Sequence, residues 1–218
     1  MHLKKEAISI MKLNNVSLSY GKKVVASNIN AQLLPGELVC LVGRNGAGKS
    51  TLIKHILNIY PDPKLISVVL TDKIDVERLT VRDVVAMGRM PYTGFFGKLT
   101  KHDEEVVTSS IKLLGMEDFA DRQFTTLSDG ERQKAIIAKA LAQETPYILL
   151  DEPTAFLDHP SKVSCMKLLR SLCKEQGKAI LISTHDIEVA LQECDKVWWM
   201  ADGTLREMTV DSFSPNLL

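Results

Sequence analysis

The strongest restriction on the fold of this chain is the segment GRNGAGKS at residues 43–50. Its spacing is that of a complete phosphate-binding P-loop, and a P-loop needs a strand before it and a helix after it. Both are present, because an apolar run at 37–42 precedes the segment and a helical pattern follows from Thr51 to about Ile59. The alternative, an accidental glycine-rich turn, arises by chance in roughly one chain in a hundred of average composition. The context therefore favours a nucleoside triphosphate site.

The residue types of this loop fit phosphate chemistry. Glycines let successive backbone N–H groups surround a phosphate, and the helix that follows directs its N-terminus at the anion. Lys49 supplies a positive charge to the β- and γ-phosphates, and the hydroxyl of Ser50 is a suitable Mg²⁺ ligand. The predicted nucleotide-binding residues of the loop are Gly43, Arg44, Asn45, Gly46, Ala47, Gly48, Lys49, Ser50 and Thr51.

Composition excludes several other classes of protein. The chain has 218 residues, of which 45% are hydrophobic and 25% charged, as expected for one ordinary globular domain. Its formal net charge is zero, which gives no support to nucleic-acid binding. No apolar run approaches the roughly 20 residues of a membrane span, and the N-terminus lacks the apolar core of a signal peptide. The four cysteines show no CxxC spacing, so we expect reduced thiols in a cytosolic protein.

The hydrophobic pattern predicts an α/β fold. Strand-like residues fill the first forty positions, and strands then alternate with helices, which indicates a mostly parallel sheet covered on both faces. Asp202-Gly203 is expected to turn a final hairpin. The other predicted strands are 147–150 and 179–183, and the other predicted helices are 81–87, 104–114, 131–143, 161–175 and 187–194, with an irregular loop at 92–97.

A second nucleotide-related pattern is the apolar strand at 147–150, which ends in Asp151 and Glu152. Two carboxylates at a strand end are often only solvated, but after a P-loop they match the Walker B arrangement. Asp151 is then expected to hold Mg²⁺, through a water molecule. Glu152 is expected to orient and deprotonate the water that attacks the γ-phosphate.

The segment LSDGERQ at 127–133 could by itself be an ordinary helix cap, with Ser128 as the capping residue. Together with the other motifs it makes the chain resemble the ATP-binding-cassette (ABC) family over nearly its whole length. In that family the signature LSGGQ contacts the γ-phosphate held by the P-loop of a second subunit. The resemblance assigns this role to Ser128, Asp129, Gly130 and Glu131. Asp129 and Glu131 depart from the signature, and Asp129 should repel phosphate unless it points away or pairs, for instance with Arg132.

Further positions match the family in order. Asp158, in the stretch AFLD, corresponds to the D-loop that communicates across the dimer, and His185 to the switch histidine that contacts the γ-phosphate. Tyr20, followed by Val25, corresponds to the aromatic residue that stacks on adenine, although it could be an ordinary strand tyrosine. The resemblance thus implies Lys49, Glu152 and His185 as catalytic residues.

Two departures concern the region before the predicted helix at 81–87. The family places a glutamine that reaches Mg²⁺ where this chain has Thr71, so the hypothesis is that Thr71, or a water it holds, replaces the amide. The stretch between Pro63 and Val68 is also about 20 residues shorter than usual in the family, where it holds an edge strand and a turn. Either the lobe is reduced or the sequence omits residues, and both readings stay open.

The resemblance implies one ABC nucleotide-binding domain over 1–218: a P-loop NTPase core with an N-terminal antiparallel β subdomain and a helical signature subdomain at about 79–143. It implies ATP and Mg²⁺ as cofactors and an ATP-bound homodimer. The dimer would dock under two membrane permease subunits at the cytoplasmic face of the cell membrane, together with a substrate-binding protein and without nucleic acid. Residues 80–92 and 97–100 resemble the importer branch for iron-siderophores, haem and cobalamin.

Other classes remain as alternatives. One is an exporter, and another is a non-transport cassette of translation or DNA repair, which usually fuses two cassettes or carries coiled arms. A third is an unrelated P-loop kinase or GTPase, which would lack the segment 127–131 and His185 at this spacing.

Overall fold

A six-stranded sheet forms the centre of the computed structural model, which describes residues 10–21, 23–70, 77–94 and 97–214. The strand order is β4-β5-β6-β3-β7-β8, in which the first five run parallel and β8 returns antiparallel after the turn at 202–203. The strands are β4 (Ile66–Val69), β5 (Tyr147–Asp151), β6 (Ala179–Ser183), β3 (Leu38–Gly43), β7 (Lys196–Ala201) and β8 (Thr204–Thr209). The mostly parallel α/β sheet predicted from the sequence is confirmed.

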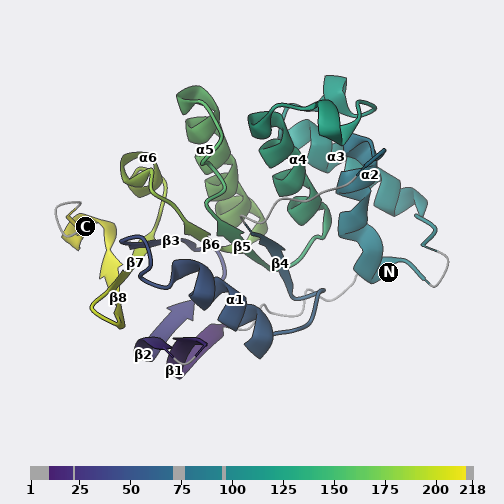
Figure 1. The fold of residues 1–218 in the computed structure, drawn as a ribbon. Coiled ribbons are helices and arrows are strands. Elements are labelled where there is room, and N and C mark those ends of the chain that lie inside the picture. The colour runs from purple at the N-terminus through teal and green to yellow at the C-terminus, as the bar shows by residue number, and fades with distance from the viewer. Residues whose placement is uncertain (1–9, 22, 71–76, 95–96, 215–218) are drawn as a thin grey trace.

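Both faces of the sheet are covered, which explains the continuous apolar runs of its strands. Every residue of β3, β5 and β6 is buried. Side chains alternate between two cores: Leu38 and Cys40 pack in the core that includes α5 (His159–Gln176) and α6 (Ile187–Leu191), whereas Val39 packs in the core beneath. That second core contains α1 (Lys49–Ile59) and the strands β1 (Met11–Tyr20) and β2 (Lys23–Leu33), as Figure 1 shows.

The strands β1 and β2 form the predicted N-terminal antiparallel sheet. This sheet is fixed to the end of the central one, because the N–H of Ser27 donates to the carbonyl oxygen of Gly203 at 2.9 Å. It places Val25, in the first half of β2, beside the loop that follows β3.

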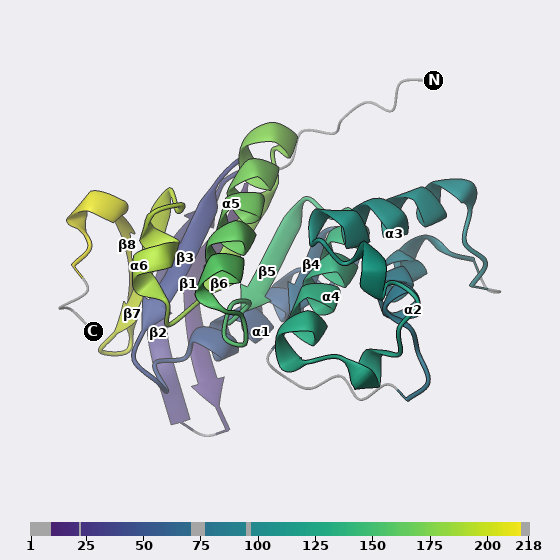
Figure 2. The ribbon, with the colours of Figure 1, turned by 90° about the horizontal axis from the view of Figure 1, so that it is seen from above.

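A helical lobe lies to one side of the sheet (Figure 2). It consists of α2 (Val81–Ala86), the 3₁₀ helix η1 (Met87–Tyr92), α3 (Lys101–Leu113) and α4 (Asp129–Ala142), with the short turns η2 (Glu117–Phe119) and η3 (Phe124–Thr126) between them; η4 (Val210–Ser212) follows β8. One prediction needs correction here. Tyr92 does not belong to an irregular loop but ends η1, because the 3₁₀ turn continues through Pro91.

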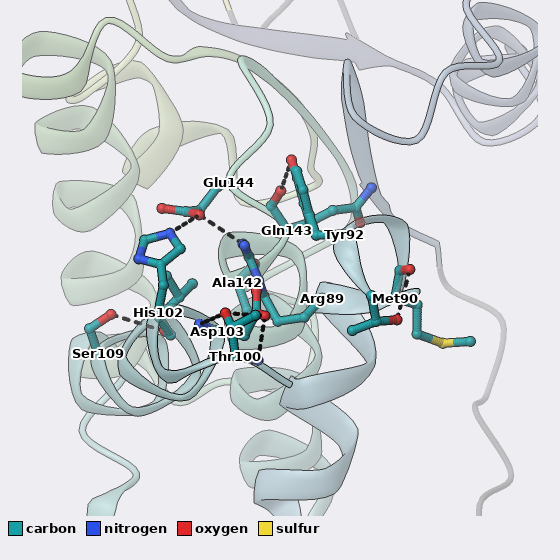
Figure 3. A network of polar contacts seen from close by, with 12 residues as sticks. Arg89, Met90, Tyr92, Thr100, His102, Asp103, Ser109, Ala142, Gln143 and Glu144 are labelled. Atoms are coloured by element: carbon teal, nitrogen blue, oxygen red, sulfur yellow. Dashed lines mark hydrogen bonds and ion pairs between the residues drawn. The ribbon is translucent and has the colours of Figure 1, made fainter. Parts of the chain in front are cut away.

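A buried polar network holds this lobe together (Figure 3). The guanidinium of Arg89, which is 2% exposed, donates to Asp103 Oδ1 at 2.8 Å and to the carbonyl oxygen of Ala142 at 2.7 Å, and it pairs with Glu144 at 2.8 Å. Its charged end lies 4.3 Å from the centre of the Tyr92 ring. Four segments, η1, α3, the end of α4 and the residues before β5, therefore meet at one cation.

The four cysteines are buried and free. Burial raises the pKa of the thiols of Cys165 and Cys173 to about 11 and about 12. Within the described part of the chain, no helix combines the length and the apolar character that crossing a membrane requires.

Candidate nucleotide-binding site

The P-loop, Glu152 and His185 meet at the carboxyl ends of three neighbouring parallel strands. Strand β6 lies between β5 and β3, with Ser183 opposite Asp151 on one side and opposite Leu41 on the other. The P-loop follows β3, Glu152 follows β5, and His185 comes shortly after β6. Ligands of open α/β sheets bind at this kind of edge, because loops from adjacent strands converge there.

A cavity of about 400 Å³ opens at this edge of the sheet. Residues of the P-loop, of β2 and of the β5 and β6 ends line it, so segments far apart in the sequence share one space. The lining residues are Lys23, Val25, Asn45, Gly46, Gly48, Lys49, Ser50, Thr51, Glu152 and His185. Lys23 was not among the predicted residues, since nothing in its local sequence distinguishes it from other exposed lysines.

The P-loop has the conformation that binds an anion. Gly46 and Gly48 have φ of 80° and 104°, in the left-handed region that favours glycine. A Cβ atom on Gly48 would lie 2.7 Å from Val25 Cγ1, so β2 packs directly on the loop. Helix α1 begins at Lys49, and no described side chain caps its N-terminus. Its first N–H groups are therefore available for a phosphate.

Lys49 lies beneath the loop and is only 7% exposed. Its Nζ donates to the carbonyl oxygens of Gly43 at 2.7 Å and Arg44 at 3.4 Å. Burial lowers the pKa of this ammonium group, and the carboxylates of Glu152 and Asp151 oppose that effect. The charge of Lys49 is thus held close to the acidic end of β5.

The side chains of Glu152 and His185 lie next to each other in the wall of the cavity. The Nε2 atom of His185 lies 3.1 Å from Glu152 Oε1, and the backbone N–H of His185 donates to Oε2 at 3.2 Å. Glu152 adopts a φ of 53°, which is strained for a residue with a side chain. Burial raises the pKa of its carboxyl group, while His185 and Lys49 act to lower it. A carboxylate with a raised pKa can act as a general base near neutral pH.

Asp151 fits the predicted magnesium role. It is 2% exposed, and its Oδ1 accepts a hydrogen bond from the Ser183 hydroxyl at 2.6 Å. Its buried Oδ2 has no hydrogen-bond partner in the described structure. A buried carboxylate oxygen without a donor needs a cation or an ordered water, and Mg²⁺ prefers such oxygen ligands. Ser50 lies on the same cavity, whereas Thr71, the other predicted ligand, lies outside the described residues.

The signature residues lie at the start of α4. Ser128 caps this helix, and the Ser128 and Glu131 side chains bond each other's backbone N–H groups in a capping box. Asp129 pairs with Arg132 at 3.5 Å, one of the two arrangements considered for its charge. A Cβ atom on Gly130 would lie 3.0 Å from the carbonyl oxygen of Phe156. Within one chain, the space beside Gly130 is therefore filled by the backbone that precedes Asp158.

One chain therefore brings together only part of the predicted site. None of the described residues that line the cavity comes from 128–131, and Asp158 instead caps α5 by accepting a hydrogen bond from the Ser161 N–H at 2.8 Å. Tyr20 ends β1, but its side chain lies outside the described part. Ser183 is a residue that sequence reasoning missed: its hydroxyl contacts Asp151, and it accepts from the Glu152 N–H at 3.0 Å.

Comparison with known proteins identifies similar chains. A family model described as "ABC transporter" matches residues 26–155. An uncharacterized ABC transporter ATP-binding protein of Methanocaldococcus jannaschii is 41% identical over 208 residues, covering 86% of this chain and 72% of the relative. A petrobactin import ATP-binding protein of Bacillus subtilis is 36% identical over 216 residues, covering 90% and 85%.

Among solved structures, a bacterial ABC transporter cassette in dimeric form superposes with a TM-score of 0.82 at 27% identity, covering 94% of this chain and 100% of that one. The same cassette is also known as a dimer in a post-hydrolysis state, bound to ADP and Pi.

Proposed function

This chain belongs to the ABC transporter family of ATPases, and from that premise we propose that two copies of it clasp two ATP molecules and drive import of a metal chelate. Each ATP would lie between the P-loop of one copy and residues 128–131 of the other. The dimer would dock at the inner face of the cell membrane under two permease subunits, with a substrate-binding protein on the outer side.

The observation that carries the two-copy proposal is the separation of the site into two parts. The P-loop, Glu152 and His185 share one cavity, and residues 128–131 do not line it. A dimeric arrangement of the kind known for the similar bacterial cassette would bring the two parts together.

The chemistry proposed for the site is attack of water on the γ-phosphorus of ATP, with release of ADP and phosphate. Glu152 takes the proton of the attacking water, and His185 holds the Glu152 carboxylate in place. Lys49 and the N-terminus of α1 stabilise the negative charge on the transferred phosphoryl group. Asp151 and Ser50 would hold Mg²⁺, which neutralises charge on the β- and γ-phosphates when bound.

The proposed cargo is a chelate of the iron-siderophore, haem or cobalamin type. The support is the similarity to a petrobactin import protein and the importer-like stretch 80–92. Within that stretch, Met90 and Tyr92 are exposed hydrophobic residues on η1, at 64% and 38%, and they are available to a membrane subunit.

The two-copy site is tested by light scattering of the Glu152→Gln variant with and without ATP. We expect an ATP-dependent dimer for this variant and a monomer when Lys49→Ala is added. A monomer at saturating ATP, with ATP binding demonstrated, would contradict the proposal. The cargo is tested by affinity purification of the chain with its permease from detergent-solubilised membranes. Stimulation of ATP hydrolysis by a ferric siderophore, haem or cobalamin in proteoliposomes is expected, and no stimulation by any of the three would refute the cargo assignment.

A further inference from the structure

Ser128 has two hydrogen-bond donors, and both are directed at one carboxylate oxygen. The backbone N–H of Ser128 donates to Glu131 Oε2 at 2.7 Å, and its hydroxyl donates to the same oxygen at 2.8 Å. The Glu131 N–H donates in return to the Ser128 hydroxyl oxygen, at 3.3 Å. Neither Ser128 donor is therefore free for another acceptor while Glu131 holds this position.

The same motif begins two other helices in the described part of the chain, where it is an ordinary helix cap. Thr80 with Asp83 begins α2, and Thr100 with Asp103 begins α3, each with the reciprocal bonds of a capping box. A structural role therefore accounts for the motif itself. The capping box of α4 differs from the other two in its location. In the proposed two-copy site, Ser128 contacts the γ-phosphate of the ATP bound by the partner copy.

The start of α4 also carries negative charge, which would repel a phosphate that approaches Ser128. The bonds from Ser128 hold the pKa of the Glu131 carboxyl below its usual range, so Glu131 is an anion at neutral pH. Asp129, two residues away, is a second carboxylate, and its partner Arg132 also donates to the carbonyl oxygen of Thr125 at 2.6 Å. Arg122 and Lys134 supply the other positive charges that act on Glu131.

We propose that Glu131 is a positioning residue that controls access to Ser128: the γ-phosphate on the partner copy binds Ser128 only after the Glu131 carboxylate has released it. The inference rests on the proposed two-copy site. A phosphate oxygen and a carboxylate oxygen are both anionic acceptors, so they compete for the same two donors instead of sharing them. Closing the dimer thus exchanges one anion for another on Ser128. Glu131 thereby sets the ATP concentration at which the dimer closes.

The neutral variant Glu131→Gln separates charge from capping. Its amide oxygen can still accept from Ser128, while its NH₂ group can donate to a phosphate. We expect the ATP concentration for half-maximal hydrolysis to fall about five- to tenfold, the effect of removing one like-charge contact near a protein surface. The turnover number is expected to change much less. The difference in half-maximal ATP concentration between Glu131→Gln and the wild-type chain should become smaller as salt rises from about 50 to 500 mM, because salt screens repulsion between exposed charges.

Asp83→Asn is the matched control, since it neutralises the carboxylate of the α2 capping box and leaves Ser128 untouched. It should leave the ATP dependence unchanged. If Glu131→Gln destabilises the chain in thermal unfolding, Glu131→Ala provides a second test, with the same direction of change in ATP dependence expected among folded molecules. An unchanged or higher half-maximal ATP concentration in the Glu131 variants, or an equal decrease in Asp83→Asn, would overturn the proposal.

Dimerisation distinguishes this proposal from the function on which it rests. In the Glu152→Gln background, adding Glu131→Gln should lower the ATP concentration needed for dimerisation by a similar factor. If Glu152→Gln dimerises with ATP but the double variant needs the same concentration, only the role of Glu131 is wrong. If Glu152→Gln never dimerises, the two-copy site is wrong and the Glu131 role falls with it.

Discussion

His185 lies against both oxygens of the Glu152 carboxylate: its Nε2 atom is 3.1 Å from Oε1, and its backbone N–H donates to Oε2 at 3.2 Å. The backbone N–H of Glu152 in turn donates to Ser183, so the backbone that carries this carboxylate is fixed as well. Orientation of a base to within a fraction of an ångström is a large part of its catalytic effect.

We therefore expect His185→Ala to lower ATP turnover about 100-fold, within the range for loss of positioned proton transfer. ATP affinity should change little, because the P-loop residues provide most of the contacts to the nucleotide. Single-turnover hydrolysis and nucleotide titration measure the two effects separately. His102→Ala is a matched control, because His102 is an exposed histidine that lies 3.4 Å from Glu144 in the helical lobe. Equal losses in both variants would indicate a general effect on folding.

Ser183 yields a prediction about magnesium. Its hydroxyl donates to Asp151 Oδ1 at 2.6 Å, whereas the buried Oδ2 has no hydrogen-bond partner in the described structure and is the atom proposed to face Mg²⁺ or its water. Residues that orient a metal ligand typically change metal affinity by about 10- to 100-fold. Ser183→Ala should raise the Mg²⁺ concentration for half-maximal hydrolysis by that factor. Ser171→Ala removes a hydroxyl that donates to the carbonyl oxygen of Leu168 within α5, and it should leave the Mg²⁺ dependence unchanged. A normal Mg²⁺ dependence in Ser183→Ala would remove Ser183 from the site.

The sequence predicted those parts of the site whose chemistry requires a fixed spacing. Gly43–Ser50, Asp151 and Glu152 are recognisable because residue type and strand context occur together along the chain. Ser183 and Lys23 were not found, because their importance depends on which strands are neighbours. Only the strand order places β6 beside both β5 and β3. Thr71 and Tyr20 stay predictions, since the structure does not describe residue 71 or the Tyr20 side chain.

The helical lobe illustrates the same limit. Apolar periodicity predicted the helices near 81–87 and 104–114. It did not predict that Arg89 is buried, because an arginine in a sequence is expected to be exposed. Burial becomes favourable only when Asp103, Glu144 and the carbonyl oxygen of Ala142 come together from three segments. That convergence belongs to the tertiary structure and leaves no local pattern.

Gly48 gives a prediction that separates backbone strain from steric conflict. An alanine there has both a φ of 104° and a Cβ atom 2.7 Å from Val25 Cγ1. Gly115→Ala is the matched control, with a φ of 63° and no atom within 4 Å. We expect Gly115→Ala to lower the free energy of unfolding by about 1 kcal/mol and to leave ATP binding intact. Gly48→Ala should cost about 2 kcal/mol or more and abolish ATP binding, as measured by urea denaturation and nucleotide titration. Retained binding in Gly48→Ala would contradict the loop geometry.

The ion pair of Arg89 and Asp103 predicts how stability depends on pH. Hydrogen bonds from Thr100, followed by those from Arg89, hold the pKa of the Asp103 carboxyl at about 2, below the value of about 3.9 expected in the unfolded chain. A lowered pKa in the folded state means that the carboxylate stabilises the fold above about pH 4, and that this stabilisation is lost as pH falls towards about 2. Asp103→Asn should therefore be about 3 kcal/mol less stable than the wild-type chain near neutral pH, because the buried guanidinium of Arg89 then loses its buried partner charge and keeps the half-exposed Glu144.

The difference between the two chains should shrink between about pH 4 and pH 2, because protonation removes the same charge from the wild-type protein. Urea denaturation at a series of pH values measures this difference directly, and other carboxyl groups cancel because both chains contain them. Asp121→Asn serves as the control, since its side chain is 93% exposed and lies 3.8 Å from Arg82. Exposed ion pairs contribute little to stability, so the free energy of unfolding of Asp121→Asn should stay close to that of the wild-type chain at every pH. A difference for Asp103→Asn that is constant down to pH 2 would mean that the carboxylate charge does not support Arg89.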